Sequence, residues 1–380
     1  MDYRKVLFSP RLWVVFFGVL LCLFFAIRTD FFVSREAALD VYRGRVLSAD
    51  DLRLEADPSI AGLYIGRQTL EIELLDGDFA GQRFRIENTL SRFFNIHAHE
   101  GMELLLFVNA HGGMVSNVEV FGYSRGSFLT VFVLLFAVVL IAVGRAKGVY
   151  AVLSLAFTLA IVVFFMLPLI IEGYNPVVLA IITAAFTAVF SITLVGGASY
   201  KSIAAISGTV LGVLVAGTVG IVAGRFASIS GMQMEHASEV IYQGGRDMVI
   251  RVPLLLFSGI IIASLGAVID VGMSISSAVF EVKKVNPALG FKHLYKSGMS
   301  VGKDIIGTMS NTLILAFAGS SIVVIVIIAL YELPFLRLVN MDLLAIEVVF
   351  GLSASLGLVF TVPITAGFAA YFAAGKKLIS

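Results

Sequence analysis

From residue 127 onward the chain is a succession of long apolar runs separated by short polar breaks. Another apolar run, 12–27, follows three basic residues near the N-terminus. Because only 14% of all residues are charged, the chain cannot cover these runs with a soluble surface. We therefore predict a polytopic α-helical membrane protein with about eight spans. Besides 12–27, the spans are expected at about 128–144, 149–171, 177–195, 202–224, 252–282, 304–331 and 343–373.

The first apolar run fits either a signal peptide or a signal anchor. No A-x-A cleavage site follows it directly. Cys22, the single cysteine, follows Val19-Leu20-Leu21 and so lacks the small residue that a lipoprotein site requires. We therefore expect residues 1–30 to form a cytoplasmic N-terminus and a first membrane anchor.

Between residues 31 and 126 the composition changes to that of a soluble domain. Alternating apolar and polar residues occupy 68–75 and 102–108, which is the pattern of half-buried strands. Turn-forming pieces, Asp76-Gly77-Asp78 and Gly112-Gly113, punctuate the segment. We predict a small extracytoplasmic β-rich domain, barrel-like in form, followed by a seven-helix membrane domain over 127–380.

Lysine and arginine are distributed unequally between the two sides of the predicted membrane domain. If the N-terminus is inside, the opposite short loops hold Arg225, Arg246, Arg251 and Arg337. The cytoplasmic side then holds Arg4, Lys5, Arg11, Arg145, Lys147, Lys201, Lys283, Lys284, Lys292, Lys296, Lys303, Lys376 and Lys377. This asymmetry predicts a protein of the bacterial cytoplasmic membrane with both termini in the cytoplasm and the β-domain outside.

Neither an enzyme nor a nucleic-acid-binding protein is indicated. The 27 basic residues are balanced by 26 acidic ones and are not clustered. H-E-x-x-H and P-loop motifs do not occur, and 301–304 reads Val-Gly-Lys-Asp where an intramembrane aspartyl protease needs Gly-x-Gly-Asp. We expect no cofactor, and as partners the lipid bilayer and a second copy or a related membrane subunit.

Five glycines in the predicted span 202–224 favour close helix packing. They are Gly208, Gly212, Gly217, Gly220 and Gly224, and two pairs among them are four residues apart. This spacing lets helix backbones approach, either within one subunit or between two.

Asp270 follows an uncharged stretch, 254–269, in the predicted span 252–282. A carboxylate at membrane depth costs several kcal/mol unless it is paired, hydrated or protonated, so it should face the bundle or a cavity. Ser274, Ser277 and Glu281 follow at helical spacing and predict one polar face. Alternatively, Asp270 is a packing acid satisfied by hydrogen bonds, and Glu281 is an ordinary charge beside two lysines at the end of the helix.

The next predicted helix carries a second polar stripe, Asp304, Thr308, Asn311 and Thr312, with Ser310 on its flank. Such groups can coordinate a partly dehydrated cation or hold a chain of water molecules. They can equally tie helices together. Two polar stripes on consecutive helices, one of them with a deep acid, favour a pathway for ions or protons.

Two further sets of residues have a functional and a neutral interpretation. The loop 225–251 is either a solvated connector or an amphipathic gate over the outer entrance. His97, His99 and His111, with Glu100 and Glu103, are of metal-ligand type. Because nothing in the sequence fixes the distance to His111, ordinary surface histidines are the preferred interpretation and no metal is expected.

The segments 265–281, LGAVIDVGMSISSAVFE, and 302–319, GKDIIGTMSNTLILAFAG, resemble YibE/F-like membrane proteins. The likeness extends to Gly66-Arg-Gln-Thr and to Arg85-Ile-Glu-Asn-Thr89 in the outer domain. More distantly, 252–373 resembles the core of the Sec-translocon D/F accessory proteins and other RND-superfamily permeases. That resemblance implies a role in proton movement for Asp270, although eight spans and a small outer domain depart from the pattern, as does the lack of a basic partner in a membrane segment.

Two functions from different classes follow. The first is a secondary transporter driven by protons or another cation, with Asp270 as the titrating site and the second polar stripe beside it. The alternative is a non-transporting accessory or scaffold subunit whose outer β-domain binds exported or membrane proteins. A transporter requires Asp270, whereas a scaffold depends on the surface of the outer domain.

Overall fold

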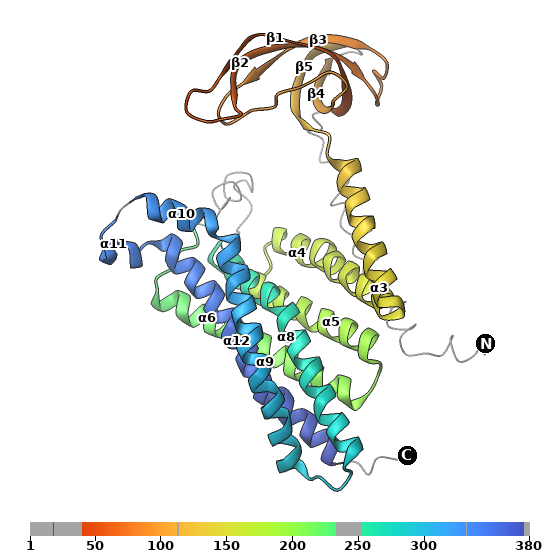
Figure 1. The fold of residues 1–380 in the computed structure, drawn as a ribbon, viewed down its shortest axis with the longest axis vertical. Coiled ribbons are helices and arrows are strands. Elements are labelled where there is room, and N and C mark those ends of the chain that lie inside the picture. Colours follow the sequence, from red (N-terminus) through yellow and green to blue (C-terminus); the bar gives the residue numbers. More distant parts are fainter. Residues whose placement is uncertain (1–17, 19–39, 112–113, 233–251, 332, 376–380) are drawn as a thin grey trace, which may run out of the picture. The chain divides into compact units, whose positions relative to one another are not determined.

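The computed structural model describes residue 18 and residues 40–111, 114–232, 252–331 and 333–375 (Figure 1). The chain divides into two compact units, of which one holds the five strands and the other holds the helices from Leu140 onward. Apart from Gly18, the predicted anchor over 12–27 lies outside the described residues.

Five antiparallel strands form one sheet in the order β3-β2-β1-β4-β5. Strand β1 pairs with β2 over most of its length and with β4 at its beginning, and two register shifts along it bend the strand. The sheet curves into an open half-barrel rather than a closed barrel (Figure 1). The strands are β1 (Asp40–Ala56), β2 (Tyr64–Leu74), β3 (Arg83–Leu90), β4 (Glu103–His111) and β5 (Met114–Tyr123).

The alternating runs form strands as predicted. Leu70, Ile72 and Leu74 on β2 are at most 1% exposed, while the residues between them are partly or fully exposed. Leu104 and Leu106 on β4 point to the same core. This period of two buries one face of the sheet and confirms the predicted β-rich domain.

The rest of the described chain is mainly helical. Among the described residues, five helical stretches are long and apolar enough to cross a membrane, or six if α9 and α10 form one bent span. These stretches indicate a multi-pass membrane protein. The elements are α3 (Gly126–Ile161), η1 (Val162–Met166), α4 (Leu167–Ile171), α5 (Pro176–Gly196), α6 (Tyr200–Phe226), α8 (Val252–Val285), α9 (Phe291–Ser320), α10 (Ile322–Leu330), α11 (Phe335–Val339) and α12 (Asp342–Ala374).

The predicted spans 128–144 and 149–171 correspond to two helices that meet at a sharp kink inside α3 and are not separated by a loop of several residues. At Arg145 the backbone leaves the helical region, with φ 50° and ψ −128°. A Cβ at Gly148 would lie 2.2 Å from the Leu140 carbonyl oxygen, so a residue without a side chain is needed for the chain to bend this sharply.

Helix α9 differs in extent from the predicted span 304–331. The segment 283–303, which we predicted to face the cytoplasm, contains the end of α8, which continues to Val285, and the start of α9 at Phe291. The first half of α9 is amphipathic and packs through its small residues, so average hydropathy does not detect it. At the other end, the predicted span 304–331 breaks at Ser321, where α10 bends away by 61°.

A buried lysine closes the turn between α8 and α9. Lys283 is 7% exposed, and its Nζ donates to the carbonyl oxygens of Pro287 and Leu289 at 2.7 and 2.9 Å. The charge thus satisfies two backbone acceptors of the turn that follows α8. The two helices are joined as a tight antiparallel hairpin.

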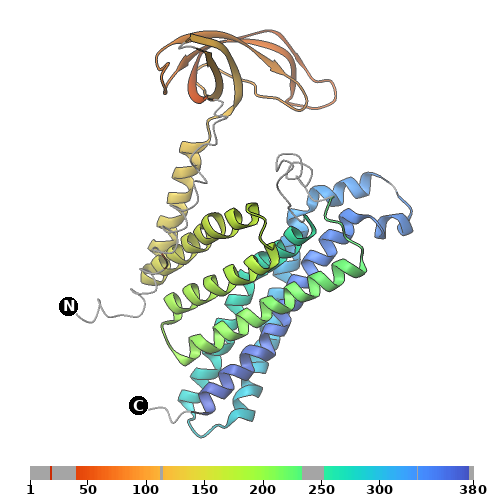
Figure 2. The ribbon, with the colours of Figure 1, turned by 180° about the vertical axis from the view of Figure 1, so that it is seen from behind.

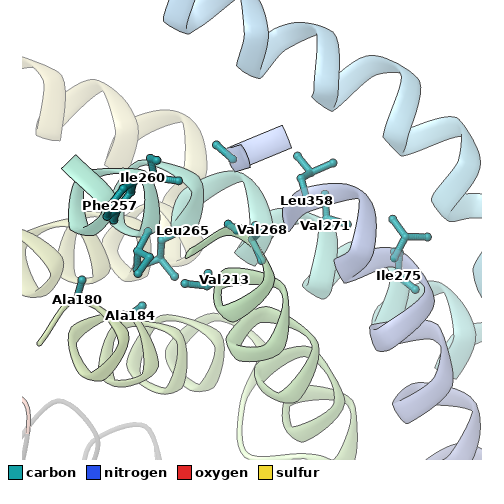
Figure 3. Close-up of a cluster of buried hydrophobic side chains, with 14 of the residues drawn as sticks. Ala180, Ala184, Val213, Phe257, Ile260, Leu265, Val268, Val271, Ile275 and Leu358 are labelled. Carbon is teal, nitrogen blue, oxygen red and sulfur yellow. The ribbon is translucent and has the colours of Figure 1, made fainter. Parts of the chain in front are cut away.

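The core of the helical unit lies between α5, α6, α8 and α12, and α9 covers α8 and α12 from outside. Figure 3 shows side chains from the four inner helices meeting in one cluster, among them Ala184, Val213, Ile260, Val268 and Leu358. Helices α6 and α12 lie side by side (Figures 1 and 2).

The glycines of α6 are the points where neighbouring helices approach most closely. A Cβ at Gly208 or Gly212 would lie 1.8 Å from the hydroxyl oxygen of Thr365 or Thr361 on α12. Toward the other end of α6, the corresponding neighbours of Gly217, Gly220 and Gly224 are Ile261, Ile260 and Phe257 on α8. These contacts lie within one subunit.

Candidate functional site

Asp270 lies on the exposed side of α8. The buried face of this helix carries Val268, Val271 and Ile275, whereas the Asp270 side chain is exposed. Contrary to the expectation from sequence, it does not point into the packed interior of the described helices. It forms no hydrogen bond or ion pair with the described part of the chain.

The remaining members of the α8 stripe follow the same side of the helix. Ser274 is exposed, Ser277 is half-buried, and Glu281 forms an exposed ion pair with Lys284 at 2.6 Å. The hydroxyl that ties α8 to a neighbour is instead that of Ser276, which donates to the Lys201 carbonyl oxygen on α6 at 2.6 Å. The predicted stripe is therefore distinct from the polar contact that fastens the helix.

The stripe on α9 is exposed as well. Asp304, Thr308, Asn311 and Thr312 all face away from the helices that α9 packs against. The hydroxyls of Thr308 and Thr312 donate to carbonyl oxygens of their own helix, at 3.1 and 2.9 Å, rather than to a neighbour. The Ser310 hydroxyl is buried and has no partner among the described residues. Neither threonine hydroxyl holds helices together within the described unit.

The packing of α8 against α9 places Asp270 at the depth of the second stripe. Gly302 lies beside Ile275, and Gly298 lies beside Val279. Continued along two antiparallel helices, this register puts Asp270 level with Gly307, next to Thr308 in sequence. The two stripes therefore lie at the same depth of the hairpin.

A second carboxylate was missed by the sequence analysis. Glu347 lies in the first part of α12, and one of its oxygens accepts a hydrogen bond from the Ser321 hydroxyl at the break between α9 and α10. The pair lines a pocket of about 310 Å³ whose other walls are largely apolar. A neighbouring, more polar pocket of about 560 Å³ contains Arg337 and Asp342. The acidic residue in the apolar run 343–373 was the available signal.

The interior of the bundle also contains hydroxyls without partners. Thr183 and Thr187 on α5, Thr209 on α6 and Thr365 on α12 are buried, and their oxygens form no hydrogen bond with the described residues. Each such group stays unsatisfied at a cost of about 1–3 kcal/mol unless it finds a partner.

The helical unit resembles one known protein family. The model of the YibE/F-like protein family matches residues 132–375. The chain belongs to the YibE/F-like family. No curated protein and no solved structure matches the chain. The YibE/F match includes both polar stripes, Ser321 and Glu347, but it does not include the five strands.

In the strand unit of this YibE/F-like protein the histidines do not form one group. The rings of His97 and His99 lie 4.3 Å apart, and His97 Nε2 is 3.0 Å from Asp51 Oδ2. His97 and His99 come shortly before β4, which begins at Glu103. His111 is the last residue of this strand, at its opposite end. No group of three or more metal-ligand side chains occurs in the described ranges.

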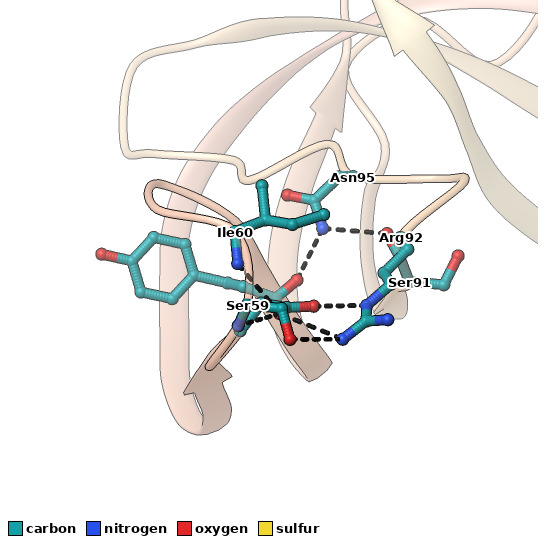
Figure 4. Close-up of polar contacts among 7 residues, drawn as sticks. Ser59, Ile60, Ser91, Arg92 and Asn95 are labelled. Atoms are coloured by element: carbon teal, nitrogen blue, oxygen red, sulfur yellow. Dashed lines mark hydrogen bonds and ion pairs between the residues drawn. The ribbon is translucent and has the colours of Figure 1, made fainter. Parts of the chain in front are cut away.

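A network of polar contacts fixes the loop after β3 (Figure 4). Arg92 Nε donates to the buried Asp57 carboxylate at 2.6 Å, and Asn95 Nδ2 donates to the Tyr64 carbonyl oxygen at 2.6 Å. The hydrogen bonds from Arg92 and from the Ser59 amide hold the pKa of Asp57 below its usual value. Between these anchors, Phe93 is fully exposed.

The predicted gate over 225–251 falls largely outside the described residues. Of this loop the structure describes residues 225–232. Helix α6 ends at Phe226, and Ser228 just after it has a positive φ of 54°.

Proposed function

We propose that this YibE/F-like protein is a secondary transporter driven by protons or another cation, with Asp270 as the coupling site and an unknown substrate. The observation that carries the proposal is a carboxylate without a partner among the described residues, on the exposed side of an apolar helix and level with a second polar stripe. Such a group is costly in hydrocarbon and needs water, an ion or protein beside it.

The exposed polar faces favour a pathway along the α8–α9 hairpin over simple helix gluing. If the polar residues only held helices together, they would point to neighbours, as Ser276 does. Instead, Asp270, Ser274 and Asn311 are available to solvent, ions or another chain. A carboxyl group in such a position can bind a proton from one side and release it to the other as access alternates.

The proposal includes eight spans in a bacterial cytoplasmic membrane, with both termini in the cytoplasm. It also includes a second copy or a related membrane subunit that covers part of the exposed polar face. The distant resemblance of 265–281 and 302–319 to the core helices of RND-superfamily permeases supports proton movement at Asp270.

Flux measurements in proteoliposomes test the proposal. We expect the wild-type protein to carry protons or another cation across the membrane and Asp270→Asn to fold but to lose this coupled flux. Asp270→Glu should retain part of it. Glu172→Gln, which removes an exposed carboxylate at the end of α4, is the matched control and should transport normally. Full flux in well-folded Asp270→Asn would overturn the proposed coupling site.

The alternative function, an accessory subunit, rests on the fixed loop after β3. The loop presents Phe93 at 100% and Phe94 at 51% exposure, close in sequence to an anchored arginine. Exposed aromatic side chains on a rigid loop are typical of protein contact sites. Phe93→Ser with Phe94→Ser should abolish function in a scaffold and spare flux in a transporter.

A further inference from the structure

The pocket at the break between α9 and α10 combines a carboxylate with an apolar surface. Glu347 and Ser321 are its polar members, while Phe317, Ile325, Val348 and Leu352 contribute apolar walls. Ser321 is 6% exposed and donates its hydroxyl to one oxygen of Glu347. The other carboxylate oxygen has no partner among the described residues.

We infer that this pocket binds an organic ammonium ion with an apolar body. The carboxylate has no cationic partner within the described ranges, so a positive head group would supply the missing charge. The apolar walls, which include the aromatic ring of Phe317, would enclose the rest of the ligand.

The size of the pocket agrees with a small organic ligand. Its volume of about 310 Å³ is at the lower end of the range for ligand sites. This is about twice the ~150 Å³ of a cavity that holds benzene. Ile325, Val348 and Leu352 are between 44 and 52% exposed, so the pocket is open on one side. A ligand can therefore enter without unfolding the helices.

Two other occupants fit less well. A hard inorganic cation takes about six or more oxygen ligands, whereas the side chains of this pocket provide one carboxylate and one hydroxyl. A neutral lipid chain would cover the carboxylate without compensating its charge, which is unfavourable. Charge complementarity therefore favours the ammonium ion.

The site does not depend on the proposed transport activity, because Asp270 is not part of the pocket. Binding is measurable in the absence of a gradient. The flux and binding measurements are therefore independent. Loss of binding with normal flux would contradict only this inference, and binding without flux would contradict only the proposed function.

Equilibrium binding to the full-length protein in lipid nanodiscs tests the inference. The probe is radiolabelled benzyltrimethylammonium, whose charge does not change with pH, and neopentylbenzene is its uncharged carbon analogue. We expect Glu347→Gln to weaken binding of the ammonium about tenfold or more, with little change for the analogue. Asp342→Asn removes a carboxylate five residues earlier in α12, outside this pocket, and should bind the probe as the wild type does. Equal affinity of wild type and folded Glu347→Gln would overturn the site.

A second measurement needs no variant. A hydrophobic carbodiimide should modify Glu347 in the wild-type protein, as followed by peptide mass spectrometry. Saturating benzyltrimethylammonium should slow this modification about fivefold or more, while neopentylbenzene should protect less. If the ammonium does not protect Glu347, the pocket is not its binding site.

Discussion

Among the described residues, buried polar side chains in the strand unit have hydrogen-bond partners, whereas several in the helical unit do not. Gln68 is fully buried, and its amide donates to Ala98 and Asp51 and accepts from Ala98 and Asn88, at 2.6–3.2 Å. In the helices, Thr209 is equally buried, but its hydroxyl has no partner among the described residues. The contrast teaches that the described buried polar residues of the sheet serve its architecture, whereas the helical unit contains both architectural ones, such as Ser276, and hydroxyls with hydrogen-bonding capacity left over.

The largest effect should come from breaking the Gln68 network. Gln68→Leu would leave Ala98, Asp51 and Asn88 with unsatisfied groups, so we expect a loss of about 3 kcal/mol in the stability of the sheet. Hydrogen exchange of the β2 amides in the full-length protein would then be about a hundredfold faster. Gln82→Leu, at an exposed position, is the control and should leave exchange unchanged. A silent Gln68→Leu would remove the contrast between the two units.

Helix packing gives the next effect. Because a Cβ at Gly208 would overlap Thr365, Gly208→Ala should destabilise the helical unit by about 2 kcal/mol. Gly307→Ala is the matched control, since nothing lies within 4 Å of its Cβ position. Thermal unfolding in detergent compares the two variants. Equal stability would mean that α6 and α12 are not closely packed.

The contribution of Asp57 to the stability of the strand unit should depend on pH. The pKa of Asp57 is lowered by its hydrogen bonds from Arg92 and from the Ser59 amide, so its contribution to stability is present above the unfolded value of about 3.9 and lost as pH falls through the folded value. We expect Asp57→Asn to be less stable than wild type at pH 7 and the difference to shrink below about pH 4. Unfolding measured from pH 7 to pH 3 decides it. If the difference in stability between wild type and Asp57→Asn did not change with pH, the negative charge of Asp57 would not be the source of its contribution.

The smallest effect is expected in the interior of the helices. Thr209→Val keeps the shape and removes a buried hydroxyl without a described partner, so we expect the variant to be more stable than wild type by about 1 kcal/mol. Thermal unfolding in detergent measures this difference. A loss of about 1.5 kcal/mol or more would show that the hydroxyl is bonded to water or to another chain.

Elements whose pattern is set by local periodicity, such as β2, could be predicted from the sequence. Features that are set by contacts with neighbouring helices, such as the exposed side of α8, could not. Alternation along 68–75 was sufficient for β2, because strand faces repeat every two residues. The break at Ser321 was missed because no proline marks it, and the signal that was available, Gly319-Ser-Ser321 inside the apolar run, was not used. Asp270 was recognised as an isolated acid, but which side of α8 is covered depends on the packing of α5, α6, α9 and α12.

Lys283 has a mechanical consequence for the hairpin that it closes. Because its ammonium group fastens the turn from inside, α8 and α9 are held at a fixed spacing near that end. At the other end of α9, the Ser321 hydroxyl is bonded to Glu347 of α12. Helix α9 is therefore tied to its surroundings at both ends, by a lysine to the turn after α8 and by a serine to α12.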